Sequence, residues 1–131
     1  MMEKTVKFLN DAKTFFIATI NNDKPEVRPF GAIGVFENKL YIMTGAKKDV
    51  AKQIELNNNV AISAMCGGNW IRINTTLIKD EDINAKKAML DQNPNLRSMY
   101  NENDSNMVVY YFKNTKSTFC SFTSSPFVEK F

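Results

Sequence analysis

Histidine is absent from the 131-residue chain. Without it the chain cannot build a Ser-His-Asp or Cys-His nucleophilic centre, an imidazole proton relay or the usual catalytic zinc site. The chain has only two cysteines, Cys66 and Cys120, and two separated thiols do not complete a structural zinc site. No metal site is therefore expected, and any chemistry must come from a bound cofactor or from carboxylate, lysine or tyrosine side chains.

Arginine and long apolar runs are also scarce. Three arginines stand among 17 basic residues, the net charge is only +3, and no RNP-type motif occurs, so nucleic acid is not an expected partner. The longest apolar runs, such as Phe15–Ala18, are too short to cross a bilayer, and the N-terminus lacks the apolar core of a secretory signal. Both cysteines lie in strand-like apolar stretches, so we expect buried, reduced thiols and a cytoplasmic protein.

What is present suits one globular domain over residues 1–131. Hydrophobic residues make up 44% of the chain and include 10 Phe, which is enough for a core at this length. Hydrophobic periodicity and turn residues predict three helices and about seven strands, mostly joined by hairpins. The helices are expected at 3–12, 49–57 and 80–90, and the strands at 15–20, 26–36, 39–44, 60–65, 70–79, 107–112 and 117–122.

This order predicts an α+β fold built on a small antiparallel, Greek-key-like β-barrel with peripheral helices, because hairpins dominate and the helices are inserted between strands. Pro29 in the second strand indicates an edge position or a bulge. Gly31 and Gly34 indicate bending or a close approach of backbone. Asp49 is the expected N-cap of the second helix, and Asn114-Thr115 is the expected turn of the last hairpin.

The segment Thr44–Asp49 is the first candidate site. A strand ends in a hydroxyl, Gly45 bends the chain, Lys47 and Lys48 follow, and a helix begins. Free N–H groups at a helix start together with a cation can hold a phosphate. The spacing is not that of a Walker loop. On these residues alone, a solvated lysine pair beside a helix cap is the favoured alternative.

Two further candidates lie on strands. Alternation places Trp70 and Arg72 on one face and Ile71 and Ile73 on the core face, so Trp70 and Arg72 form either a solvated cation–π pair or part of a site or interface. In Val27–Gly31, an arginine precedes a proline and a glycine. That pattern fits either a protected edge strand or a backbone that something approaches closely.

Taken in order, these segments resemble the pyridoxamine 5′-phosphate oxidase-like FMN-binding split-barrel family, in particular its small bacterial members grouped with nitroimidazole-resistance-type flavoproteins. The resemblance runs nearly end to end, and its most specific parts are Arg28-Pro29-Phe30-Gly31 and Trp70-Ile71-Arg72 at their separation. It extends through Phe16–Thr19, Lys39–Val50, Gln53-Ile54 and Ser121–Thr123.

The resemblance implies a homodimer with two FMN sites at the subunit interface, each lined by both chains. By matching position, the strand from Arg28 through Pro29, Phe30 and Gly31 runs along the isoalloxazine ring. Thr44 and Lys48 hold the phosphate, with Lys47 a weaker candidate. Gln53 contacts the flavin from a helix, and Trp70 and Arg72 approach it at the interface. A cation at the N1–C2=O edge of the flavin favours its reduced anionic form.

The chain also departs from the family. Asn74 stands where a glycine is common, and neither the longer C-terminal segment of pyridoxamine phosphate oxidases nor the histidine near the flavin of nitroimidazole reductases is present. The leading hypothesis is an FMN-dependent oxidoreductase that passes electrons between NAD(P)H and an unidentified small molecule. The alternatives are a non-catalytic FMN carrier or redox sensor and, ranked below both, a nucleic-acid-binding barrel. The catalytic residues stay unassigned.

Overall fold

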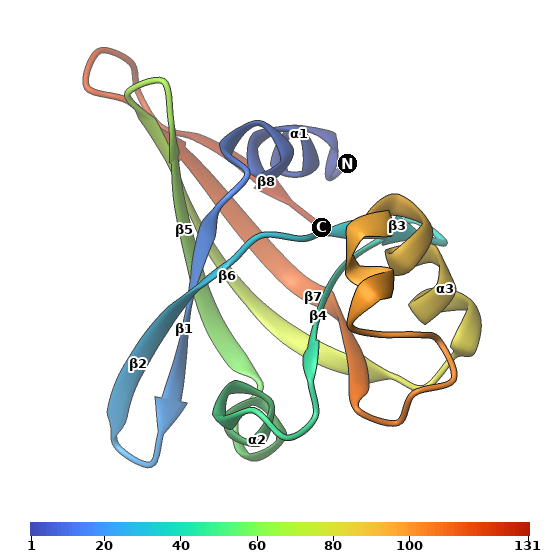
Figure 1. Cartoon of the computed structure of the whole chain (residues 1–131). Coiled ribbons are helices and arrows are strands. Elements are labelled where there is room, and N and C mark those ends of the chain that lie inside the picture. The colour runs from blue at the N-terminus through green and yellow to red at the C-terminus, as the bar shows by residue number, and fades with distance from the viewer.

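The computed structural model describes all 131 residues as three α-helices, one short 3₁₀ helix and eight strands (Figure 1). In chain order these are α1 (Glu3–Ala12), β1 (Phe15–Asn21), β2 (Lys24–Phe30), β3 (Gly34–Phe36), β4 (Lys39–Gly45), α2 (Asp49–Leu56), β5 (Asn59–Cys66), β6 (Asn69–Asp80), α3 (Ile83–Gln92), η1 (Pro94–Ser98), β7 (Met107–Cys120) and β8 (Phe127–Lys130).

All strand pairs are antiparallel and form one sheet in the order β2-β1-β5-β6-β7-β4-β3, with β8 added beside β7. The sheet curls, but no ladder joins its two ends, β2 and β3. Residues 31–33 carry the chain from one end to the other, as Figure 1 shows. The barrel is therefore split along β2, which confirms the expected α+β split-barrel fold.

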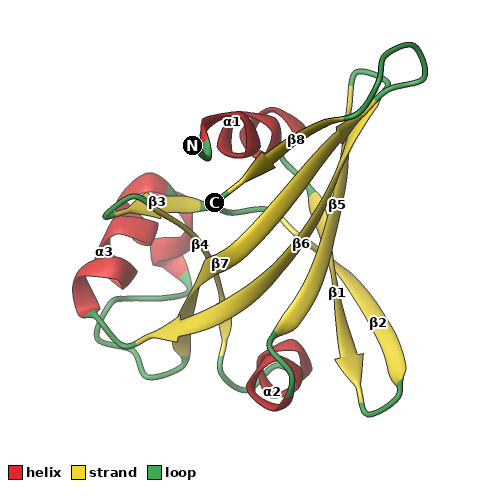
Figure 2. Cartoon of the chain, turned by 180° about the vertical axis from the view of Figure 1, so that it is seen from behind, coloured by secondary structure: helices red, strands yellow, loops and turns green.

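The core fills the inside of the curled sheet. Ile17, Ile62, Ile71 and Ile73 point inward and are fully buried, as strand alternation predicts. Leu9 of α1 packs onto this core, and so do the apolar residues Val50, Ala51 and Ile54 of α2. Figure 2 shows α1 and α2 at opposite ends of the sheet. Burial of these apolar faces is the main stabilisation of the fold.

A second apolar cluster lies between α3 and the outer side of β4. Tyr41 and Met43 of β4 pack there against Met89 and Leu90 of α3. Strand β4 is therefore covered on both faces, which explains its continuous apolar run. The helix lies so close to β3 that a Cβ on Gly34 would overlap Met89 Sδ. The close approach expected at Gly34 is therefore present, between the β3 backbone and α3.

Two of the expected strand assignments are wrong. The single strand expected over 26–36 is divided into β2 and β3, because residues 31–33 leave the first ladder and cross the opening of the barrel. The hairpin expected across Asn114-Thr115 is instead one strand, β7, and the last hairpin joins β7 to β8. Asn114 has φ 53°, but it lies beside a register shift in the β6–β7 ladder. A bulge and a turn favour the same residue type.

The helix starts also differ from expectation. Lys48, not Asp49, is the N-cap of α2, and no side chain caps that helix. In α3 the cap is Asp82, whose side chain accepts a hydrogen bond from the Asn84 N–H, so Asp80 and Glu81 precede the helix. Cys66 and Cys120 are free thiols, as expected, but they are half-buried. None of the helices is both long enough and apolar enough to cross a membrane.

Candidate functional site

The opening of the barrel contains a cavity of about 400 Å³. One side is the end of β2 and the link that follows it, and the other is the end of β4 with the start of α2. Six of the ten residues predicted from the sequence line it together: Arg28, Pro29, Phe30, Gly31, Thr44 and Lys48. Residues far apart in the chain thus meet because the barrel is split at this position.

Unpaired hydrogen-bond donors gather at the α2 end of this cavity. Thr44 is the last residue before Gly45 in β4; most of the residue is buried, and its hydroxyl makes no hydrogen bond within the chain. Because α2 has no side-chain cap, the N–H groups of Asp49 and Val50 have no acceptor. The ammonium group of Lys48 has no carboxylate within ion-pair distance. This set of donors suits an anion.

Asn106 holds the loop that carries these donors. Its backbone carbonyl accepts a hydrogen bond from Ala46 N at 2.7 Å, and its side-chain Oδ1 accepts one from Lys47 N at 3.3 Å. These two N–H groups are therefore engaged, whereas those of Asp49 and Val50 stay free. The Lys47 side chain is exposed and does not line the cavity. Its place as a phosphate ligand stays a prediction, weaker than that of Lys48.

A hydrogen-bond network fixes the guanidinium of Arg28 beside the cavity. Its Nη1 donates to Thr19 Oγ1 at 2.7 Å and to the Ile17 carbonyl at 3.3 Å, and its Nη2 donates to Gln53 Oε1 at 2.9 Å. The Thr19 hydroxyl also donates to Gln53 Oε1, at 2.5 Å. Gln53 is buried and lies outside the cavity wall. In this chain it ties α2 to β1 and β2.

The same network reaches Glu26 at the surface. Gln53 Nε2 donates to Glu26 Oε1 at 2.9 Å, and Asn21 Nδ2 donates to Glu26 Oε2 at 2.9 Å. These two hydrogen bonds, that of Asn21 first, lower the pKa of Glu26 from its usual value. Glu26 therefore stays ionised near neutral pH, with the Arg28 guanidinium 3.7 Å away.

Trp70 and Arg72 lie elsewhere, on the outer face of the sheet. With Phe16 and Val27 they line a separate depression of about 400 Å³ across β1, β2, β5 and β6. Trp70 packs against Phe122, with ring centroids 5.0 Å apart. No cation–π contact joins Trp70 to Arg72, since the two such contacts in the chain belong to Lys4 and Lys39. Of the two alternatives, the cation–π pair is therefore wrong.

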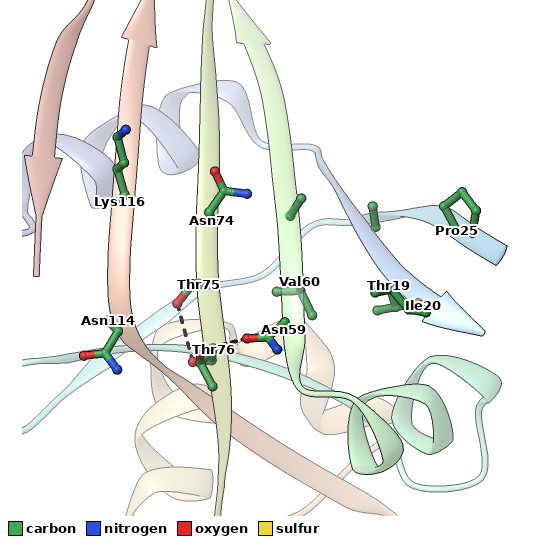
Figure 3. A pocket seen from close by; sticks show the side chains of 12 residues that line it. Thr19, Ile20, Pro25, Asn59, Val60, Asn74, Thr75, Thr76, Asn114 and Lys116 are labelled. Carbon is green, nitrogen blue, oxygen red and sulfur yellow. Dashed lines mark hydrogen bonds between the residues drawn. The ribbon is translucent and has the colours of Figure 1, made fainter. Parts of the chain in front are cut away.

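A second outer depression adjoins the first, and seven of its twelve lining residues carry polar side chains (Figure 3). The two share Ala18, Ala61 and Asn74, which are partners in register across β1, β5 and β6. The small side chains of Ala18 and Ala61 leave the surface depressed at these positions. Asn74 of β6 lines the depression next to β5, as Figure 3 shows. Its side chain makes no hydrogen bond within the chain.

One wall of the cavity was not predicted from the sequence. It comes from the end of α3 and from η1, in a stretch that composition predicts only as a polar loop or short helical piece. Its residues are Asn93, Asn95, Leu96, Met99 and Tyr100. The only signal in the sequence is Pro94, which starts the 3₁₀ turn.

Comparisons with known proteins agree with this architecture. The family model of pyridoxamine 5′-phosphate oxidase matches residues 1–106. A crystal structure of a NimC/NimA family protein from Clostridium acetobutylicum is 34% identical, with a TM-score of 0.96 over 99% of this chain and 92% of that one. No curated protein matches the chain.

More distant structures share the fold. General Stress Protein 26 from Bacillus anthracis is 20% identical, with a TM-score of 0.78 over the full length of both chains. A protein of the pyridoxinephosphate oxidase family from Clostridium acetobutylicum, related to general stress protein 26, is 10% identical, with a TM-score of 0.74 over 98% of this chain and 93% of that one.

Proposed function

The chain belongs to the pyridoxamine 5′-phosphate oxidase family, and from this premise we propose that it binds FMN in the split of its barrel and passes electrons from a reduced nicotinamide to a small molecule. Membership of this family supports a flavin-binding fold. FMN, when bound, supplies the redox chemistry. The chain's own residues would bind its phosphate, orient its ring and keep water from it.

The observation that carries the proposal is the cluster of free donors at the α2 end of the cavity. The Thr44 hydroxyl, the Lys48 ammonium and the N–H groups of Asp49 and Val50 can together hold one phosphate group. No carboxylate lines the cavity, and its volume of about 400 Å³ falls in the range of small-molecule sites. From this end the β2 backbone and Phe30 extend along the space left for a ring.

A non-catalytic role as an FMN carrier or redox sensor is the second candidate. The observation in its favour is the set of ionisable groups that line the cavity, which are only Arg28, Lys48 and Tyr100. Arg28 is engaged in its network and Lys48 is assigned to the phosphate. No side chain that lines the cavity is therefore free to act as a general acid or base near neutral pH. Reoxidation of bound, reduced FMN by candidate acceptors separates the two roles.

We expect FMN to bind more tightly than FAD. The donor cluster holds a single phosphate, and the chain lacks the Gly-x-Gly-x-x-Gly segment that accommodates a dinucleotide pyrophosphate. Calorimetric titration of the purified protein with each flavin measures this preference. Tighter binding of FAD, or no binding of FMN, would contradict the proposed function.

We propose that the outer face of β1, β2, β5 and β6 pairs with a second copy of the chain. Large apolar side chains are exposed on it, including Val27 at 65%, Met65 at 64% and Phe16 at 47%. A contiguous apolar surface of this kind is unusual on a monomer. Pairing would bring Trp70 and Arg72 of each copy toward the other copy's cavity, as family resemblance implies, with Arg72 at the N1–C2=O edge of the flavin.

Val27→Glu should therefore turn a dimer of about twice 14.9 kDa into a monomer, because a carboxylate would lose its solvation within the apolar interface. Ile83→Glu is the matched control. Ile83 is also exposed, but it lies on α3, away from this face. Light scattering gives both masses. A monomeric unmodified protein with FMN bound would refute the interface.

A further inference from the structure

The cavity wall formed by Asn93–Tyr100 indicates which class of substrate can bind next to the flavin. Resting on the proposed function, we infer that the substrate is an uncharged aromatic compound carrying carbonyl-type oxygens, and that this wall selects it. The wall presents Leu96 and Met99 as apolar surface and Asn95 and Tyr100 as neutral polar groups. It presents no charged side chain, so it favours apolar ring surface and offers a charged group no partner.

The one charged residue within this stretch is turned away. Arg97 Nη2 donates to Asp91 Oδ1 at 2.6 Å, and Arg97 Nη1 donates to Glu102 Oε2 at 3.1 Å. Two carboxylates therefore neutralise the guanidinium and hold it outside the cavity wall. Although an arginine lies between Leu96 and Met99 in the sequence, it contributes no positive charge to the cavity.

The cations that do line the cavity are already engaged. Arg28 donates to Thr19, Gln53 and the Ile17 carbonyl and faces Glu26. Lys48 stands at the phosphate end beside the free N–H groups of α2. No further cation from this chain remains to bind a phosphate, sulfonate or carboxylate on a substrate. An anionic group placed against the wall would lose water without gaining a partner.

Two neutral donors remain for recognition. The Tyr100 hydroxyl and the Asn95 amide line the cavity, and neither side chain makes a hydrogen bond within the chain. Asn93, in contrast, donates to the Ile33 and Met89 carbonyls at 2.8 Å and 3.0 Å. Free hydroxyl and amide donors beside apolar surface complement the oxygens of a carbonyl on an uncharged ring.

A matched pair of compounds tests this inference. Para-acetylbenzenesulfonamide and para-acetylbenzenesulfonate share the ring and the carbonyl and differ in charge. Each is titrated into FMN-loaded protein, and binding is followed through the shift of the visible flavin band. We expect the sulfonamide to bind at least about tenfold more tightly than the sulfonate, because the charged sulfonate finds no cationic partner on the wall.

A positive charge placed on the wall should reduce or abolish the preference for the uncharged compound. Met99 is 66% exposed, so Met99→Arg can fold, and it should strengthen sulfonate binding by roughly tenfold through a charge-assisted contact. Met99→Gln, of similar size but uncharged, should not.

The outcomes separate the two proposals. If FMN fails to bind, the proposed function is refuted and this inference with it. If FMN binds but the sulfonate binds as tightly as the sulfonamide, or neither compound binds, only the inference is overturned.

Discussion

Replacing Lys48 by alanine is expected to weaken FMN binding by roughly ten- to a hundredfold, the size of one charge-assisted contact of about 1.5–3 kcal/mol. Lys48 lines the cavity beside Thr44 and the free N–H groups of α2, and no carboxylate competes for its ammonium group. The phosphate would therefore lose the cation that lines the cavity at the α2 end, while the backbone donors remain. Calorimetric titration of the variant with FMN measures the loss.

Lys47→Ala is the matched control for this change. It removes the same charge one residue earlier, from a side chain that is exposed and outside the cavity. Its effect should stay small, because both lysines are exposed but only Lys48 lines the cavity, so the Lys47 charge would act on the phosphate only through screening solvent. The difference between the two variants should shrink in riboflavin binding, since riboflavin has no phosphate. Equal small losses of FMN affinity in both variants would mean that the two lysines are surface charges.

Gln53→Leu should destabilise the fold by about 2–3 kcal/mol, because it leaves Arg28 Nη2 and the Thr19 hydroxyl without their shared acceptor. The volume of leucine is close to that of glutamine, so little of the loss would come from packing. Arg28 is only 22% exposed, so water replaces the lost acceptor incompletely. Urea unfolding at constant m-value measures the change in the free energy of unfolding.

Lys52→Leu provides the comparison for Gln53→Leu. It introduces the same residue one position earlier in α2, where the side chain is exposed and unpaired. Its effect on the free energy of unfolding should be within about half a kcal/mol, as for most surface changes. If Gln53→Leu is no more destabilising than Lys52→Leu, the network contributes nothing to stability. The flavin contact that the family resemblance implies would then be the remaining role for Gln53.

The sequence predicts most of the fold because local signals agree with one another. Alternation in Trp70–Ile73 assigns the core face, and the structure places Ile71 and Ile73 inside. Strands β1, β4, β5 and β6 are found within one residue of their expected ends. Sequence patterns mislead where one residue type favours two different backbone geometries. Asn114 suits a turn and a bulge alike, and only the pairing of Lys113 and Lys116 with β6 on either side of it decides between them.

The sequence predicts the parts of the site whose residues are close in the chain and misses the parts that come from distant segments. Thr44 and Lys48 are near neighbours at a strand–helix junction, so their common role is visible in the sequence. Their meeting with Arg28 and Phe30 depends on the split of the barrel, which family resemblance supplied. Leu96 and Tyr100 reach the cavity from a stretch whose composition has no periodicity. No single segment contains the information that this stretch faces β2.

The strand order also constrains the sequence of events during synthesis. Strands β1, β2, β5 and β6 can pair as soon as they are made, and so can the β3–β4 hairpin. The two groups share no ladder until β7 bridges β6 and β4. Gln53 already ties α2 to Arg28, but β4 and its Thr44 share no ladder with the group of Arg28 before residues 107–120 have emerged. A flavin thus finds no complete seat on the nascent chain, and the barrel must close on its own interactions before any cofactor can reinforce it.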